Sequence, residues 1–129
     1  MNYPKPELYK TISREIVING VSHSVQVTIS TCIDMDYDPN DQDFDTDNHR
    51  QDFVDKFKSG MLEAIGVIVK ASLCGETGTD SIWGNIVGDG YTVENVISEH
   101  GMTQNALIEL QSNLKTQYLS LKNLFEVKP

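Results

Sequence analysis

Residues 11–33 read TISREIVINGVSHSVQVTISTCI, and this stretch decides the fold. Two runs rich in β-branched residues are joined by Asn19-Gly20, the dipeptide that best accepts the positive φ angles of a two-residue hairpin turn. If Ile18 lies opposite Val21, even positions before the turn and odd positions after it share one face. That face collects Ile12, Ile16, Ile18, Val21, Val25, Val27 and Ile29. The other face is polar, so an antiparallel hairpin covered on one side is predicted.

A second hairpin is predicted after it. Residues 61–74 place Ile65, Val67, Val69, Ala71 and Leu73 on one face of a long central strand. Gly75-Glu76-Thr77-Gly78 is its predicted turn, and residues 82–87 form a short returning strand that ends at a Gly-Asp-Gly sequence.

The remaining segments predict helices. Residues 49–60 have helical spacing, with Asp47 or Asn48 as the N-cap and Gly60 as the C-cap. A helix capped by Thr92 ends at Gly101, and a longer one starts at Thr103. The longer helix carries one apolar stripe, predicted to be core: Leu107, Leu110, Leu114, Tyr118, Leu121 and Phe125.

These elements predict an α+β fold: a four-stranded antiparallel sheet made of two β-hairpins, a short helix between the hairpins, and two C-terminal helices packed on one face. At 129 residues the chain is one domain, predicted over 10–129, behind a flexible arm at 1–9. Within it lie an acidic loop at 34–48 and the C-terminal helices at 92–126. If these helices carry more apolar surface than is needed to cover the sheet, the excess predicts a homodimer.

The charge balance restricts the partners. Ten Lys and Arg against nineteen Asp and Glu give a net charge of −9 and a pI near 4.6. Phosphate binding depends on Lys and Arg, so direct binding of nucleic acid or anionic lipid is not expected, whereas a basic partner is. The absence of a long apolar run or a signal-peptide pattern predicts a cytoplasmic protein without a membrane partner.

Residues 34–48 read DMDYDPNDQDFDTDN and contain no Lys or Arg. Their seven aspartates are Asp34, Asp36, Asp38, Asp41, Asp43, Asp45 and Asp47. Three hypotheses compete: an irregular Ca²⁺ or Mg²⁺ site, a surface that binds a basic partner and mimics nucleic acid, or a solvated loop. The helix-loop-helix calcium motif fails because Pro39 and Asp45 stand where it needs Gly and Glu.

The sequence around the only tryptophan is the second unusual feature. Asp80, Ser81 and Trp83 follow the predicted turn and suggest a small-molecule pocket, although neither a phosphate loop nor a nucleophile elbow is present. Cys32 and Cys74 are expected to be reduced thiols, since no family signature of a nucleophilic cysteine surrounds them. The three histidines lie far apart in the sequence, which disfavours a metal-dependent hydrolase.

Four features in order resemble a group of small phage and prophage proteins. They are the acidic segment 34–47, a short helix ending at Ser59-Gly60, the apolar strand 64–71, and the sequence Asp-Ser-Ile-Trp-Gly at 80–84. The resemblance covers roughly residues 34–115 and supplies no catalytic residues. It implies an accessory protein acting in a bacterial cytoplasm, a class that often blocks host machinery.

Together these features favour a non-enzymatic binding protein without a cofactor, whose acidic segment engages a basic site on a host or defence protein. The alternative is a domain that binds a small molecule or divalent metal through the aspartates or near Trp83. Neutralising the aspartates would distinguish these two hypotheses, because only binding to a basic protein depends on the whole acidic segment.

Overall fold

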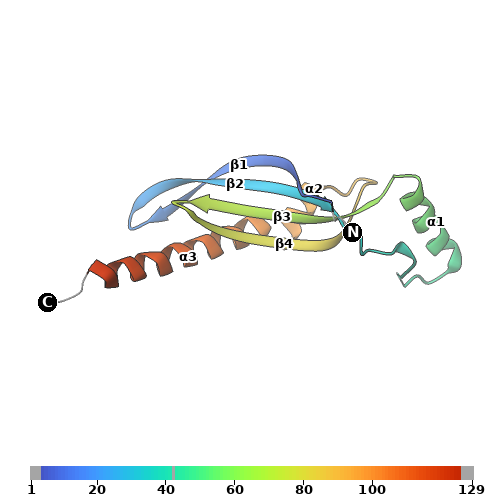
Figure 1. Cartoon of the computed structure of the whole chain (residues 1–129). Helices are drawn as coiled ribbons and strands as arrows, with labels where there is room; N and C mark the ends of the chain where they lie inside the picture. Colours follow the sequence, from blue (N-terminus) through green and yellow to red (C-terminus); the bar gives the residue numbers. More distant parts are fainter. Residues whose placement is uncertain (1–3, 42, 126–129) are drawn as a thin grey trace.

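The chain, in a computed structural model that describes residues 4–41 and 43–125, has the predicted α+β architecture (Figure 1). Its antiparallel strands lie in chain order: β1 (Glu7–Ile18), β2 (Val21–Ile33), β3 (Glu63–Leu73) and β4 (Glu76–Val87). The helices are α1 (Asp47–Lys58) between the hairpins, then α2 (Val93–His100) and α3 (Met102–Phe125), with a single 3₁₀ turn, η1 (Pro39–Asp41), before α1.

The first hairpin has the predicted register. Ile18 pairs with Val21 across Asn19 and Gly20, whose φ angles are 51° and 78°. Val25 and Val27 are fully buried on the predicted face, but Val21 is exposed because it sits at the hairpin tip. The predicted arm at 1–9 is too long, since β1 begins at Glu7, which pairs with Thr31. Residues 1–3 of that arm lie outside the described residues.

The second hairpin turns earlier than predicted. Cys74 and Gly75 form the turn, with φ angles of 53° and 79°, and β4 starts at Glu76 rather than at residue 82. Gly78 was predicted in the turn, but it is a buried strand residue pressed against α3. The prediction failed because a glycine needed for close helix contact looks, in sequence, like a turn glycine.

The caps of α1 differ from the prediction at both ends. Thr46, not Asp47 or Asn48, is its N-cap, accepting a hydrogen bond from the His49 backbone amide at 3.2 Å. Its C-cap is Ser59 rather than Gly60, which follows it with a left-handed φ of 81°. For α2 the capping box of Thr92 and Asn95 and the left-handed Gly101 are as predicted. α3 begins at Met102, one residue before the predicted start, and the end of the predicted 92–126 segment, residue 126, lies outside the described residues.

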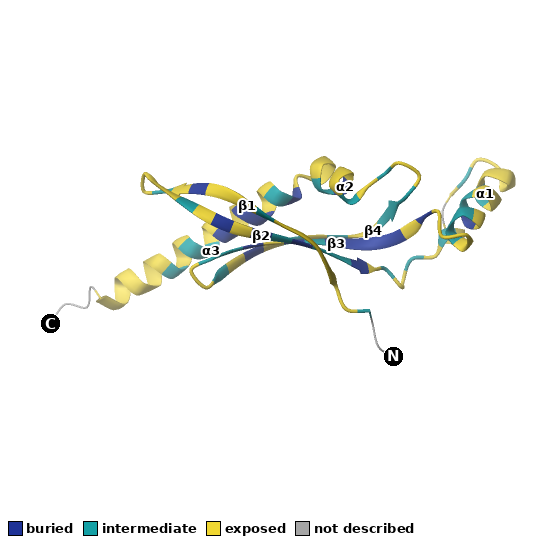
Figure 2. Cartoon of the chain, turned by 90° about the horizontal axis from the view of Figure 1, so that it is seen from above, coloured by how far each residue is buried: buried dark blue, intermediate teal, exposed yellow. Residues whose placement is uncertain are grey.

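One face of the sheet holds the core. α3 packs on β3 and β4, and Val67, Val69, Met102, Ala106 and Leu110 are fully buried (Figure 2). The prediction that the whole apolar stripe of α3 is core is wrong. Leu107 and Leu110 are buried and Leu114 is partly buried, whereas Tyr118, Leu121 and Phe125 are exposed. No helix in the described ranges is long and apolar enough to cross a membrane.

Glu94 ties α2 to β1 and predicts a pH dependence. Its carboxylate accepts hydrogen bonds from the Tyr9 hydroxyl at 2.6 Å and the Lys10 ammonium at 3.2 Å. These two bonds, Tyr9's first, lower the pKa of Glu94 below its ordinary value. The pKa of Glu94 is therefore lower in the folded than in the unfolded chain. The stability that these bonds contribute is fully present above the unfolded pKa and is lost as the pH falls through the folded pKa.

We therefore expect Tyr9→Phe to raise the pKa of Glu94 toward its ordinary value in a carboxyl NMR titration. Glu94→Gln is expected to make stability less dependent on pH over this acidic range, as measured by thermal melts. Glu109 is exposed and makes no hydrogen bond or ion pair within residues 4–41 and 43–125, so Glu109→Gln serves as the control. An unchanged Glu94 titration in Tyr9→Phe would contradict the prediction.

Candidate functional site: the acidic lobe

Residues 34–62, here called the acidic lobe, form a separate lobe between β2 and β3 at one end of the elongated molecule (Figure 1). The lobe holds nine aspartates and three basic residues, Arg50, Lys56 and Lys58, so its net charge is −6 out of −9 for the whole chain. Two-thirds of the net charge is therefore concentrated at one end.

An aromatic cluster folds the acidic segment onto α1. The ring of Tyr37 stacks on Phe57 at 5.5 Å between centroids, and Phe44 packs on Phe53 at 5.1 Å. Phe53 and Phe57 contact each other edge to face at 5.0 Å, and Val54 beside them is buried. Neither Tyr37 nor Phe44 was predicted to have a structural role, although two aromatic residues within a mostly polar run are typical of an anchored loop rather than a solvated one.

Three of the seven predicted partner-binding aspartates have structural roles. Asp34 accepts hydrogen bonds from the backbone amides of Gly84 on β4 and of Asp36, at 2.8 and 3.1 Å. Asp38 accepts from the Asn40 backbone amide at 2.9 Å and so starts the η1 turn. Asp45 pairs with His49 in the first turn of α1. These contacts shape the loop.

The other four aspartates face solvent. Asp36, Asp41 and Asp43 are exposed, and their carboxylates make no hydrogen bond or ion pair with any residue that the structure describes. Asp47 is fully exposed, and among the described residues its carboxylate pairs with Arg50 alone, at 3.9 Å. The lobe therefore presents free carboxylates on a folded support, rather than along an extended strand as a linear mimic of nucleic acid would.

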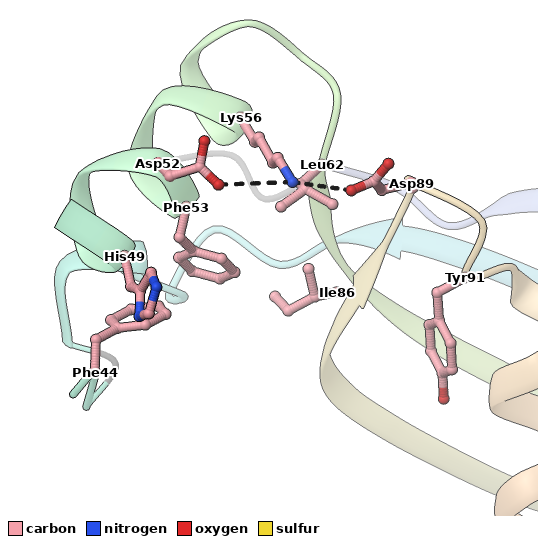
Figure 3. Close-up of a pocket in the computed structure, with 10 residues that line it drawn as sticks. Phe44, His49, Asp52, Phe53, Lys56, Leu62, Ile86, Asp89 and Tyr91 are labelled. Carbon is pink, nitrogen blue, oxygen red and sulfur yellow. Dashed lines mark hydrogen bonds and ion pairs between the residues drawn. The ribbon is translucent and has the colours of Figure 1, made fainter. Parts of the chain in front are cut away.

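An open pocket of about 480 Å³ lies where the lobe meets the β4–α2 connection (Figure 3). Phe44, Phe53 and Leu62 from the lobe and Ile86 and Tyr91 from the sheet side form its apolar lining. Its polar side chains are those of His49, Asp52, Lys56 and Asp89. The pocket thus combines an apolar lining with ion-paired rim groups.

Lys56 links the lobe to the sheet across this pocket. Its ammonium lies 3.0 Å from the Asp89 carboxylate and 3.7 Å from that of Asp52, between the two (Figure 3). The hydrogen bond to Asp89, with the charges of Asp89 and Asp52, raises the pKa of Lys56 above its ordinary value. The Lys56 ammonium therefore connects α1 of the lobe to Asp89 in the β4–α2 connection.

The residues predicted around the tryptophan do not form one group. Asp80 faces α3 and accepts a hydrogen bond from the Asn105 amide at 3.0 Å. By strand alternation Ser81 and Trp83 lie on the opposite, uncovered face of β4. There the half-exposed Trp83 indole lies over Gly66, where a Cβ would come within 2.4 Å of the ring. Only Ser81 and Trp83 could thus contribute to the predicted pocket together.

The described ranges, 4–41 and 43–125, hold no group of three or more His, Cys, Asp or Glu arranged to hold a metal ion. Cys32 is buried and Cys74 is exposed, and both are free thiols. His23, His49 and His100 lie on β2, α1 and α2. No protein-family model, no curated protein and no solved structure matches this chain.

Proposed function

We propose that this protein is a non-enzymatic binding protein that docks its acidic lobe onto a basic surface of another protein. The observation that carries the proposal is a net charge of −6 concentrated in one lobe. The aromatic cluster supports it, because free carboxylates held on an ordered loop lose little conformational freedom on binding. Charge concentrated in this way accelerates encounter with an oppositely charged partner.

The resemblance to phage accessory proteins suggests the class of partner: a host or defence protein with a basic site, including one that normally holds nucleic acid. The lobe then occupies that site and blocks it. Small-molecule or divalent-metal binding remains the alternative, and the two differ in their dependence on the exposed carboxylates.

The test is a triple variant, Asp36→Asn, Asp41→Asn and Asp43→Asn, which neutralises the three unpaired carboxylates of the lobe. Its matched control is Glu7→Gln, Glu63→Gln and Glu109→Gln, three exposed acids outside the lobe that make no hydrogen bond or ion pair with any described residue. Both variants change the net charge from −9 to −6, since each removes three negative charges. Only the position of the charge differs between them.

Wild-type protein is expected to capture a specific basic protein from bacterial lysate and to release it at about 1 M salt, where the Debye length falls to about 3 Å. With the partner identified, calorimetry should show binding weakened by about tenfold or more for the lobe variant, as expected for charge pairs at an interface. The control should bind like wild type. Equal weakening by both variants, or capture insensitive to salt, would reject a lobe-specific site.

A further inference from the structure

The C-terminal half of α3 leaves the sheet and continues past its hairpin turns (Figures 1 and 2). Residues 114–125 are here called the α3 extension. Leu110, just before it, is fully buried, whereas Leu121 is 48%, Leu124 64% and Phe125 83% exposed. An isolated helix of this length is marginal in water, so an apolar extension of this kind needs packing to be stable.

The apolar face of α3 continues into the extension with one polar position. Leu107, Leu110, Leu114, Gln117, Leu121 and Leu124, here called the α3 seam, follow one another at alternating spacings of three and four residues. This is the a and d pattern of a helix that packs along another helix, with one polar d position at Gln117. The sheet covers the first part of the seam, and nothing in the described chain covers Leu121 and Leu124.

A groove lies between the α3 extension and the tips of both hairpins. Its volume is about 660 Å³. Val17 and Ile18 from the first hairpin and Leu73 from the second form one wall, and Leu114 and Tyr118 from α3 form the other. The groove therefore opens at the same end of the molecule as the exposed part of the seam and is lined largely by apolar side chains.

We propose that a second copy of this chain covers this end, with the two α3 extensions packed antiparallel about a twofold axis. In this arrangement Leu114 of one copy lies opposite Leu124 of the other, and Gln117 lies opposite Leu121. The helix tip carrying Phe125 then enters the other copy's groove. The interface is isologous, because each copy supplies both a tip and a groove.

The sheet excludes the parallel arrangement. It lies on the seam side of its own helix, where Leu107 and Leu110 are buried against it. Two helices joined seam to seam in parallel would bring both sheets into the same space. Antiparallel pairing places the partner's helix tip just beyond the sheet, where the groove is open.

The exposed apolar area is of the size that such a dimer needs. The side chains concerned are Val17, Tyr118, Leu119, Leu121, Leu124 and Phe125. At about 200 Å² for an aromatic side chain and about half of that for an aliphatic one, their exposed parts amount to roughly 500 Å² per copy. A homodimer of standard size buries about 800 Å² per partner, of which about two-thirds is apolar.

Charge favours the same geometry. Between Leu110 and Phe125 the chain has Lys115 and Lys122 and no acidic residue. The acidic lobe, with its net charge of −6, lies at the other end of the molecule (Figure 1). Antiparallel pairing keeps the two lobes at opposite ends of the dimer, where salt screens their repulsion.

The first test is sedimentation equilibrium of the full chain at micromolar concentrations. Wild type is expected to be a dimer whose melting temperature rises with concentration. The double variant Leu121→Glu and Leu124→Glu should weaken dimerisation by roughly 30-fold or more, as loss of central interface residues does. The matched control is Ile108→Glu, which alters a 56% exposed residue of α3 outside the seam and should leave the dimer intact.

The second test fixes the orientation by disulfide trapping in a Cys74→Ser background. A mixture of the single variants Gln117→Cys and Leu121→Cys should form the mixed disulfide, because antiparallel pairing places these positions opposite each other. Self-linked Leu121→Cys would instead indicate parallel helices. A monomeric wild type, a predominance of self-linked Leu121→Cys, or equal weakening by the Ile108→Glu control would overturn the proposal.

Discussion

Replacing Gly78 with alanine is expected to lower the free energy of unfolding by about 3 kcal/mol, the upper end of the range for overpacking a core. A Cβ at this position would lie 2.2 Å from the Ala106 carbonyl oxygen and 2.3 Å from the Leu110 amide nitrogen. Both are backbone atoms of α3, so no side chain can rotate away. The helix must move off β4, and the contacts of Leu110 with the sheet loosen with it.

Gly75→Ala is the control for this prediction, measured by urea or thermal unfolding. Gly75 has a φ of 79° and open space around it. Alanine there costs only the strain of a left-handed backbone conformation, about 1–2 kcal/mol. A loss for Gly78→Ala no larger than for Gly75→Ala would show that α3 does not press on β4 as closely as described.

Replacing Phe53 with alanine is expected to release the acidic segment from α1. Phe53 contacts both Phe44 and Phe57, so its removal breaks two of the three ring contacts in the lobe. A Phe→Ala change in a core costs about 3–5 kcal/mol, and the half-buried Phe53 should cost about 2 kcal/mol within the lobe. Hydrogen exchange is expected to rise across residues 47–58 while β2 and β3 stay protected.

Met35→Ala provides the comparison, because Met35 belongs to the same segment but is 53% exposed and outside the aromatic cluster. It should leave exchange in α1 unchanged. If Phe53→Ala instead raised exchange throughout the sheet, the lobe and the sheet would be one cooperative unit. If it changed nothing, the cluster would not be what orders the segment.

Much of the fold could be predicted from short-range patterns. Asn19-Gly20 with alternating residues on either side determines the first hairpin, and Thr92, Asn95 and Gly101 mark both ends of α2. These signals are local, because turn and cap preferences arise within a few residues. The prediction of one antiparallel sheet made of two hairpins is confirmed, and the structure adds that the hairpins pair through their inner strands, β2 and β3.

The predictions that failed depend on distant contacts. Gly78 looks like a turn residue until α3 is placed over it, and Tyr118 looks like core until the length of the sheet is known. In the acidic segment, the composition identifies the charge but not which aspartates accept hydrogen bonds within the protein and which face solvent. Asp34, for example, accepts a hydrogen bond from Gly84 on β4, a strand fifty residues away in the sequence.

The acidic lobe begins and ends at neighbouring points of the sheet. Ile33 at the end of β2 pairs with Ile65 on β3, and the Asp34 backbone amide donates to the Ala64 carbonyl at 2.9 Å. The lobe is thus an insertion between two strands, β2 and β3, whose ends already pair with each other. Doubling the length of such a loop costs only about 0.6 kcal/mol in closure entropy. Evolution can therefore exchange or enlarge this lobe while the sheet beneath it stays the same.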